Sequence, residues 1–355
     1  MRPIGVGIIG ASPDGGWAAA AHVPALQALP EYELRAVATS RPASAQRAAD
    51  LWGVDAFDDA RKLIEHPGVD LVVVAVKVTD HHELLGRALS TGKMLFSEWP
   101  LGVSLDQARD LADAAAMAGV ATLIGLQARF APAVRAMREL IEQGYIGRVL
   151  ATTLIGSGQA WGPSTDSAHA YLFDARNGAT TLSVSVGHAL DAVTHVLGDL
   201  DSITSTVAVG RDTVRVGDDR VIPVTAPDQI AITAGLRSGA VASVFYRGGL
   251  SRVGDLRWEV NGTDGDLLLS SPVPNGNLQA IELALAGANG AATRVAPIDT
   301  PDRYPELGLA GPARNVANLY RAFAHDQQHG TAEAPSFSDA VALHQLLAAI
   351  EHGSL

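Results

Sequence analysis

Hydrophobic positions follow one pattern in the first half of the chain and a different one in the second. In the first half, short continuous apolar runs alternate with helix-forming stretches. Strands are predicted at 4–10, 33–39, 69–76, 93–97 and 121–127, and helices at 17–29, 42–52, 82–90 and 104–119. Continuous apolar strands separated by helices are typical of a parallel sheet covered on both faces. This half therefore predicts an α/β domain with a doubly wound, Rossmann-type sheet, over residues 1–126.

From about residue 148, apolar and polar residues alternate along longer segments. Strands are predicted at 149–156, 203–209, 229–236, 240–247 and 257–261, and two helices at 315–330 and 338–351. Strict alternation indicates half-exposed antiparallel strands. We therefore expect residues 127–355 to form an α+β domain with a large, mostly antiparallel open sheet that carries the substrate site and the subunit interface. The small-residue stretch 286–292 is predicted to be a loop between strands.

Composition narrows the class of protein. The chain has 355 residues, no cysteine and a formal net charge of −12. The absence of cysteine excludes disulfides, thiolate metal sites and a cysteine nucleophile. No apolar run reaches the roughly 18 residues that span a bilayer, and the acidic balance opposes a nucleic-acid partner. We expect a cytoplasmic protein that acts on small molecules.

A glycine-rich turn follows the first predicted strand. Gly5, Gly7 and Gly10 match the spacing G-x-G-x-x-G, but Gly5 and Gly7 lie inside the strand. Phosphate is held by the turn after the strand, where the backbone amides at the helix N-terminus face the anion. The residues expected to bind the dinucleotide phosphates are Gly10, Ser12, Gly15, Gly16 and Trp17. A glycine-rich surface turn without a ligand is the alternative.

The end of the second predicted strand bears on the choice of cofactor. An NAD-selective site places a carboxylate there to bind the ribose hydroxyls, whereas this chain has Thr39, Ser40 and Arg41. Hydroxyl groups and a guanidinium suit a 2′-phosphate. NADP(H) is therefore the preferred cofactor and NAD(H) is possible; the alternative for Arg41 is an ordinary surface residue at the start of a helix.

Three further segments resemble one known family. They are SEWPLG at 97–102, GLQARFAPAVRAMRELIEQGYIGRV at 125–149 and GATTLSVSVGHALDAVTHVLG at 178–198. Together with the N-terminal pattern they resemble the glucose-fructose oxidoreductase/inositol dehydrogenase/MocA family. The resemblance implies a nicotinamide cofactor, which further cofactor-binding residues would contact: Lys77, His81, Glu98, Trp99, Pro100 and Gln127.

The chain departs from the family at two of its usual catalytic positions. Trp99 stands where the family carries lysine, and Val184 stands where it carries aspartate, while His188 matches the family's active-site histidine. Hydride transfer from an alcohol needs a group that takes the hydroxyl proton and a donor that steadies charge on oxygen. Tryptophan offers one neutral donor and valine offers none.

Lys77 is the candidate replacement for the missing lysine. It follows a buried-type strand, and the carboxyl ends of neighbouring parallel strands meet at the cofactor crevice. We predict that Lys77 polarises the substrate oxygen; the alternatives are a bond to the cofactor or a solvated side chain. His188 is the predicted proton-exchanging residue, with a structural bond to Asp191 or Ser185 as its alternative. No metal-binding motif is present, and we predict no metal.

Candidate substrate residues lie mainly in the segment 156–177, which is predicted to be a long loop over the crevice. It combines glycines with Trp161, Tyr171 and polar side chains, a mixture that suits a sugar because aromatic faces stack on sugar rings. Tyr246 and His188 complete the predicted substrate set. A surface excursion without a ligand is the alternative for the segment.

Two functions follow from these residues. The first is reversible hydride transfer between NADP(H) and a hydroxyl or ketone of a sugar or cyclic polyol. The second is a non-catalytic sensor that binds the dinucleotide, because EWPLG, VAVKV and GASPDGGW resemble the branch of the family that contains the fungal galactose-regulon repressor. The resemblance also implies a homo-oligomer, either a dimer or a tetramer, without a nucleic-acid or membrane partner.

Overall fold

The computed structural model describes residues 2–353, and its contacts divide the chain into two units. The first unit contains the residues up to Gln127 together with Tyr304–Ala342. The second contains Ala128–Arg303 together with the residues from Leu343 onward. The sequence pattern predicts a single boundary at residue 126, with everything after it in the second domain. The segment 304–342 is the difference, since it clusters with the first unit.

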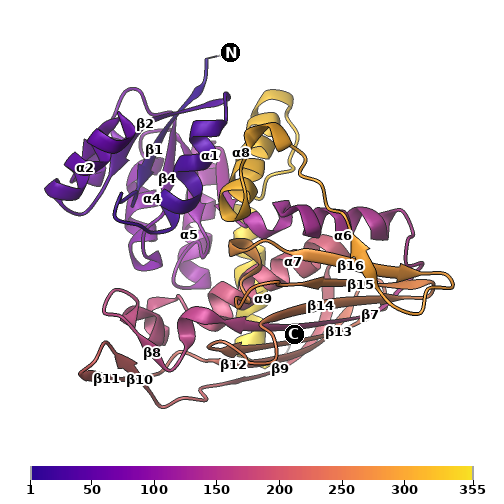
Figure 1. The fold of residues 1–355 in the computed structure, drawn as a ribbon. Helices are drawn as coiled ribbons and strands as arrows, with labels where there is room; N and C mark the ends of the chain where they lie inside the picture. Colours follow the sequence, from indigo (N-terminus) through magenta and orange to yellow (C-terminus); the bar gives the residue numbers. More distant parts are fainter. Residues whose placement is uncertain (1, 354–355) are drawn as a thin grey trace. The chain divides into compact units, whose positions relative to one another are not determined.

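A parallel sheet of six strands, counted over residues 2–353, forms the middle of the first unit (Figure 1). Its strands are β1 (Ile4–Ile9), β2 (Tyr32–Ala38), β3 (Asp55–Phe57), β4 (Leu71–Val74), β5 (Met94–Glu98) and β6 (Thr122–Gly125). They lie in the spatial order β3-β2-β1-β4-β5-β6. This is the strand order of doubly wound dinucleotide-binding sheets. The predicted Rossmann-type fold of the N-terminal half is thereby confirmed.

Helices follow the strands of this sheet as the sequence pattern predicts. They are η1 (Ala18–His22), α1 (Val23–Ala28), α2 (Pro42–Trp52), α3 (Ala60–Ile64), η2 (Val78–Asp80), α4 (His81–Leu89) and α5 (Leu105–Ala118). Helix α5 shows how local chemistry sets the ends of a helix. At its start the Ser104 hydroxyl accepts a hydrogen bond from the backbone N–H of Gln107 at 3.3 Å, and at its end Gly119 adopts a φ of 63°. A serine N-cap and a left-handed glycine are the standard terminators of a helix.

Helix α8 (Gly311–His329) comes from the distant C-terminal part of the chain and packs beside η1 and α1 in the first unit (Figure 1). After it, the Pro335 carbonyl accepts the amide of Ile124 at 2.9 Å, next to β6. These contacts explain why the segment 304–342 belongs to the first unit. The hydrophobic period of the sequence predicts this helix, but it does not predict which sheet the helix covers.

The second unit is built on a sheet of eight strands, within the part of the chain that the structure describes. In spatial order they are β17 (Ala296–Ile298), β16 (Ala284–Asn289), β15 (Gly265–Ser270), β14 (Leu256–Gly262), β7 (Val149–Gly158), β13 (Val241–Gly248), β12 (Gln229–Leu236) and β9 (Leu200–Ala208). All neighbouring pairs are antiparallel except β7 with β13, which is parallel. The predicted large, mostly antiparallel sheet is therefore confirmed.

One face of this sheet is covered by helices. Two of these are α6 (Pro132–Glu142) and α7 (Gly187–Leu197), and η7 (Thr181–Val186) packs on β7 and β13. Figure 1 shows α6 and α7 running along the sheet. On β12 and β13, buried residues alternate with exposed or half-exposed ones, as the period of two predicts. Helix α9 (Phe337–Glu351) starts in the first unit and ends in the second.

Two local predictions need correction. The stretch 286–292 was predicted to be a loop, but Ala286–Asn289 forms most of β16 and pairs with β15 and β17. The small residues serve close packing there, because a Cβ on Gly287 would lie 2.7 Å from Ile298 and 2.9 Å from Leu267.

The segment 156–177 is also more ordered than a long loop. Strand β7 continues to Gly158 and short elements follow it: η4 (Gln159–Trp161), β8 (Ser164–Thr165), η5 (Ala170–Phe173) and η6 (Ala175–Asn177). Strand β8 pairs with β10 (Thr213–Val216), which pairs in turn with β11 (Arg220–Pro223) to form a small separate sheet. Elements of two to four residues are too short to show a hydrophobic period, so the sequence pattern does not reveal them.

Candidate functional site: a dinucleotide pocket and a buried histidine

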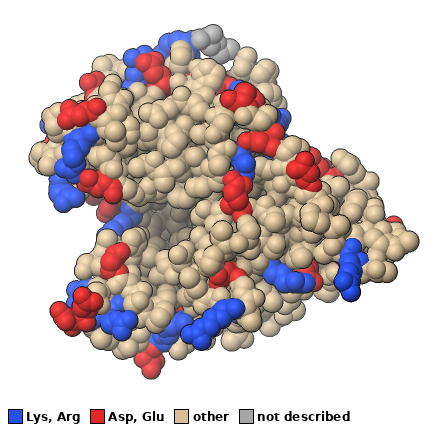
Figure 2. All heavy atoms as spheres, viewed as in Figure 1, with Lys and Arg blue, Asp and Glu red and all other residues tan. Residues whose placement is uncertain are grey.

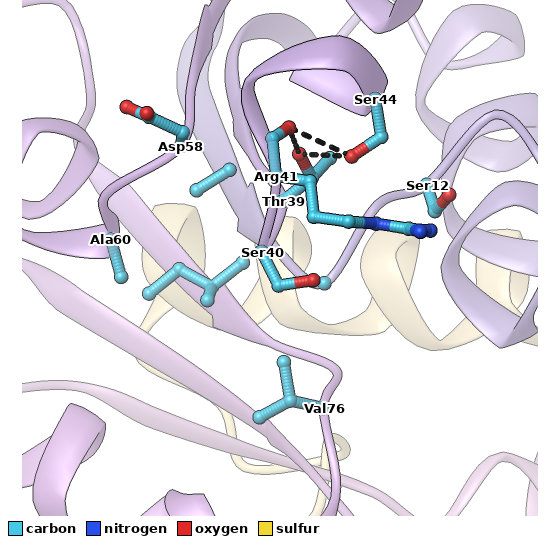
Figure 3. Close-up of a pocket in the computed structure, with 11 residues that line it drawn as sticks. Ser12, Thr39, Ser40, Arg41, Ser44, Asp58, Ala60 and Val76 are labelled. Carbon is cyan, nitrogen blue, oxygen red and sulfur yellow. Dashed lines mark hydrogen bonds between the residues drawn. The ribbon is translucent and has the colours of Figure 1, made fainter. Parts of the chain in front are cut away.

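A pocket of about 390 Å³ lies at the carboxyl ends of β1 and β2 in the first unit (Figure 3). Its lining is Ile9, Gly10, Ser12, Ala38, Thr39, Ser40, Arg41, Ser44, Asp58, Ala60 and Val76. The structure thus brings together the predicted phosphate turn and the predicted cofactor-selecting residues. This is the edge of an open α/β sheet at which ligands bind.

Backbone geometry in the turn after β1 requires glycine. Gly10 has φ of 102°, and a Cβ there would lie 2.4 Å from the Ala75 carbonyl oxygen. Gly15 and Gly16 have φ of 127° and 101°, and a Cβ on either would meet no described atom within 4 Å. Gly10 is therefore glycine because the backbone just after β4 approaches closely, whereas Gly15 and Gly16 keep the open side of the turn bare.

Ser12 and Asp14 stabilise the same turn. The Ser12 hydroxyl accepts the amide of Asp14 at 3.3 Å, and the Ser12 carbonyl accepts the amide of Gly15 at 3.3 Å. The Asp14 carboxylate is paired with Arg47 of α2. The turn is therefore tied to the helix that follows β2, the strand whose end lines the pocket.

A small hydroxyl network lies at the end of β2. The Ser44 hydroxyl contacts the Thr39 hydroxyl at 2.7 Å and the Arg41 carbonyl at 2.9 Å. In Figure 3 the Arg41 guanidinium extends toward Ser12, while the Asp58 carboxylate points away from it. Over residues 2–353 no carboxylate lies within ion-pair distance of Arg41. Its cation is thus available to an anion at the pocket.

These residues fit a dinucleotide. A glycine turn with a bare open side leads into a helix, which is the arrangement that receives phosphate. The neighbouring strand ends with hydroxyls and an unpaired cation rather than a carboxylate. Two more predicted cofactor residues carry buried polar atoms that lack a hydrogen-bond partner within the described residues, namely Trp17 Nε1 and Gln127 Oε1. Such atoms favour a missing polar ligand.

Lys77 and His81 follow β4. Lys77 is exposed and directly precedes η2. His81 is buried: its Nδ1 lies 2.9 Å from the Pro100 carbonyl and its Nε2 lies 3.2 Å from the Val76 carbonyl. Burial lowers the pKa of His81. The ring thus links the end of β4 to the SEWPLG segment from the inside, and a direct contact between His81 and the cofactor stays a prediction.

Glu98 is the last residue of β5, and Trp99 and Pro100 follow it. Trp99 is only 6% exposed, and the Trp99–Pro100 peptide bond is cis. Glu98 Oε1 lies 2.9 Å from Nε2 of His22 on η1. His22 is not among the site residues predicted from the sequence. A polar residue within the apolar run AAAAHVPAL was the available signal, because a buried histidine needs partners.

His188 begins α7 in the second unit, just after the wide π-helical turn of η7. It is buried, and within the described residues its Nδ1 has no hydrogen-bond partner. Burial lowers the pKa of His188 to about 3. The imidazole is therefore neutral at physiological pH.

Both structural partners considered for His188 are engaged elsewhere. The Asp191 carboxylate is held by Arg129, with Nε at 2.9 Å from each carboxylate oxygen. The Ser185 hydroxyl donates to Asn277 Oδ1 at 2.8 Å. Neither bond therefore explains why a histidine occupies this position. His195, two turns later on the same helix, contacts Arg138 at 3.0 Å through Nε2.

The predicted substrate residues of the second unit are mostly internal. Trp161 is buried and its Nε1 donates to the Leu172 carbonyl at 3.2 Å. Tyr246 is fully buried, its hydroxyl donates to the Gly276 carbonyl at 3.3 Å, and burial raises its pKa. Tyr171 is partly exposed and burial raises its pKa. Substrate contacts by Trp161 and Tyr246 stay predictions to which this packing lends no support.

Metal-binding clusters and membrane-spanning helices are both absent from the described part of the chain. Within residues 2–353, no group of three or more His, Asp or Glu side chains is arranged to hold a metal ion, and no helix is long and apolar enough to cross a membrane. Figure 2 shows acidic and basic side chains interspersed over the face in view. A broad basic surface, which a nucleic-acid backbone would need, is not seen on that face.

Family models match both domains. Residues 4–126 match the oxidoreductase family with an NAD-binding Rossmann fold, and residues 132–271 match the C-terminal domain of Gal80p. The N-terminal match agrees with the Gfo/Idh/MocA resemblance that the sequence motifs indicated, and the C-terminal match is to a Gal80p-type domain.

Individual relatives include both regulators and dehydrogenases. The galactose/lactose metabolism regulatory protein GAL80 of Saccharomyces cerevisiae is 29% identical, over 90% of this chain and 81% of that protein. Levoglucosan dehydrogenase of Pseudarthrobacter phenanthrenivorans is 26% identical, over 76% of this chain and 74% of that protein.

Solved structures share the fold. A crystal structure of a super-repressor mutant of Gal80p from Saccharomyces cerevisiae matches with a TM-score of 0.88 at 24% identity, over 100% of this chain and 98% of that chain. Levoglucosan dehydrogenase in complex with NADH and L-sorbose matches with a TM-score of 0.82 at 22% identity, over 99% and 97%. At this identity the likeness shows the architecture.

Proposed function

We propose that the protein binds NADP(H) and transfers hydride between it and a hydroxyl or ketone of a sugar or cyclic polyol. The pocket at the ends of β1 and β2 carries this proposal, because it joins the Gly10 turn to Arg41 at the ligand-binding edge of a Rossmann sheet. A relative named levoglucosan dehydrogenase supports the substrate class.

Arg41 supports NADP(H) over NAD(H). Its guanidinium faces the pocket without a carboxylate partner among the described residues, and it is flanked by the hydroxyls of Thr39 and Ser44. Guanidinium and hydroxyl donors bind phosphate oxygens, whereas a carboxylate at this place would repel them. NAD(H) lacks the 2′-phosphate and would use only the hydroxyls.

The proposed chemistry divides between cofactor and protein. The nicotinamide, when bound, supplies the hydride acceptor or donor. His188 takes the proton of the substrate hydroxyl on its neutral ring and returns it in the reverse direction. Lys77 polarises the substrate oxygen or holds the cofactor, and Trp99 shapes the nicotinamide pocket. Lys77 and His188 belong to different units, so their cooperation is part of the proposal.

Steady-state assays test this function. Purified protein is assayed with NADPH against a broad panel of oxidised sugars and inosose-type ketones, and with NADP⁺ against the corresponding alcohols. We expect turnover with at least one member of the panel. Tight cofactor binding without turnover on any member would replace the enzyme proposal by the sensor proposal below.

A second candidate function is a sensor that binds the dinucleotide without turnover. Trp99 and Val184 replace the family's lysine and aspartate, and GAL80, a regulatory protein, matches over 90% of this chain. In addition, a base with a pKa of about 3 is poorly matched to proton transfer near neutral pH. In this candidate, cofactor binding changes the affinity for a protein partner, so a pull-down with and without NADP(H) distinguishes it.

We also propose that the protein is a homo-oligomer that uses the outer face of the large sheet. This face carries apolar side chains that are exposed or half-exposed on three neighbouring strands: Ala151, Ile155, Ala231, Val241 and Phe245. Val241 is 59% exposed. Analytical ultracentrifugation of Phe245→Glu should show a smaller species than wild type, whereas Val253→Glu, in an exposed loop, should not. An unchanged mass for Phe245→Glu would reject this interface.

A further inference from the structure

A buried chain of hydrogen bonds runs through the first unit beneath the SEWPLG segment. His22 has no solvent exposure, its Nε2 lies 2.9 Å from Glu98 Oε1, and its Nδ1 lies 2.9 Å from the hydroxyl of Tyr320. The three residues come from η1, the end of β5 and α8. A single imidazole thus joins three elements that are far apart in the sequence.

The proton positions along this chain follow from its acceptors. Burial, together with Tyr32 and Glu98, raises the pKa of Tyr320 well above its ordinary value, so the phenol keeps its proton. A carboxylate oxygen only accepts, so the Nε2–H of His22 donates to Glu98, and the Tyr320 hydroxyl lies within hydrogen-bond distance of Nδ1 on the other side of the ring. Every member of the chain then has a partner, which a buried polar group requires.

The packing around the chain is shaped to admit it. A Cβ on Gly125 would lie 2.7 Å from Glu98 Oε1, so glycine at the end of β6 leaves room for the carboxylate. The rings of Phe96 and Tyr320 pack against His22, with centroids 5.0 and 5.7 Å away. The pairing is therefore not a surface contact that solvent would compete for.

Its place in the fold gives the chain a consequence for the ligand site. His22 lies on η1, which Trp17 separates from Gly16, and Glu98 directly precedes Trp99. Movement of one relative to the other would shift the phosphate turn against the loop that carries Trp99. Site residues are held accurately only when such supporting contacts lock them.

We propose that His22 is a positioning residue of the dinucleotide site, which fixes the Gly10–Gly16 turn and the Trp99 loop relative to each other through the Glu98–His22–Tyr320 chain. This inference rests on the proposed binding of a nicotinamide dinucleotide. His22 acts through Glu98 and the helix, and it does not contact the ligand itself.

Three variants and one matched control test the inference. Tyr320→Phe removes the hydroxyl that orients the imidazole, His22→Leu removes the donor to Glu98, and His22→Gln restores an amide donor. Tyr32→Phe is the control, because its hydroxyl donates to the Tyr320 carbonyl at 2.6 Å and is equally buried, but it lies outside the chain. Isothermal titration calorimetry measures NADP(H) binding, and circular dichroism measures thermal unfolding.

We expect His22→Leu, which loses the bond to the Glu98 carboxylate, to weaken NADP(H) binding about tenfold or more, and Tyr320→Phe, which loses a bond to the imidazole, to weaken it about threefold or more. His22→Gln should recover part of the affinity. Tyr32→Phe should lower the unfolding temperature without weakening binding. Equal affinity for all folded variants would overturn the inference, and so would equal losses for Tyr320→Phe and the control.

A measurement on the wild type keeps the inference testable if the variants do not fold. The imidazole Nε2–H of His22 is followed by NMR in protein with ¹⁵N-labelled histidine, and it is assigned in the wild type through nuclear Overhauser contacts of the His22 ring with the neighbouring Phe96 and Tyr320 rings. Titration with NADP⁺ should shift this resonance, and an unmoved resonance under saturating cofactor would overturn the inference. A wild type that binds no dinucleotide would instead refute the proposed function on which the inference rests.

Discussion

Arg129 holds the carboxylate of Asp191 through two guanidinium nitrogens, with Nε 2.9 Å from each oxygen and Nη2 2.5 Å from Oδ1. Asp191 lies one helical turn after His188 on α7 and its side chain is 2% exposed. Because this carboxylate is engaged, it does not orient the His188 imidazole. The histidine instead owes its neutral state to burial.

Breaking the Arg129–Asp191 pair should destabilise the second unit. Arg129→Met removes the guanidinium contacts of a buried carboxylate, and we expect a loss of about 3 kcal/mol in the free energy of unfolding. Urea denaturation measures this loss. The double variant Arg129→Met/Asp191→Leu should recover part of it, since no buried charge remains. A double variant as unstable as the sum of the two single variants would show that the two residues act independently.

Replacing His188 by asparagine should lower turnover about a hundredfold or more, the usual contribution of a general acid–base group, while leaving NADP(H) affinity nearly unchanged. Steady-state kinetics and calorimetry measure the two effects. His195→Asn is the matched control, because it lies on the same helix and contacts Arg138 rather than a ligand. Turnover that is unchanged in His188→Asn would remove this residue from the mechanism.

The buried histidines should make the fold sensitive to acid. Burial lowers the pKa of His188 from 6.5 to about 3, and burial, with nearby arginines, lowers that of His195 to about 3. The unfolded chain therefore binds more protons below pH 6.5. Stability should be full above that pH and fall as pH drops toward 3, by about 1.4 kcal/mol per pH unit and histidine.

Denaturation at a series of pH values checks this window. Between pH 6 and pH 4 the free energy of unfolding of His188→Asn should decline less steeply than that of wild type. The difference in slope should correspond to about one bound proton. Equal slopes in wild type and His188→Asn would mean that the His188 pKa is not lowered in the folded protein.

Arg41→Ala should change the preference between cofactors. Loss of the guanidinium removes a charged donor to a 2′-phosphate, so NADP(H) affinity should fall about tenfold or more while NAD(H) affinity changes little. Calorimetry with both cofactors measures the ratio. Arg35→Ala serves as the control, because Arg35 is an exposed residue of β2 that pairs with Glu33. Equal losses for the two cofactors would reject the assignment.

The candidate site was partly predictable from the sequence. The turn after Gly10 and the run Thr39–Arg41 were found because turn residues and strand ends are local signals, and they line one pocket. The partner of Glu98 was not found, because His22 meets it only after β1, η1 and β5 pack. Nor did the sequence show that Asp191 pairs with Arg129, since the pair joins residues 62 positions apart.

What the sequence alone determined is the class of each element: runs of buried strands and helices for the first domain, alternating strands for the second, and glycines where φ is positive. These follow from hydrophobic period and backbone sterics, which act over a few residues. Only the tertiary structure decided that 304–342 joins the first unit, that Tyr246 is a core residue and that His22 supports Glu98. Burial and long-range hydrogen bonds depend on which surfaces pack together, and no local pattern encodes that choice.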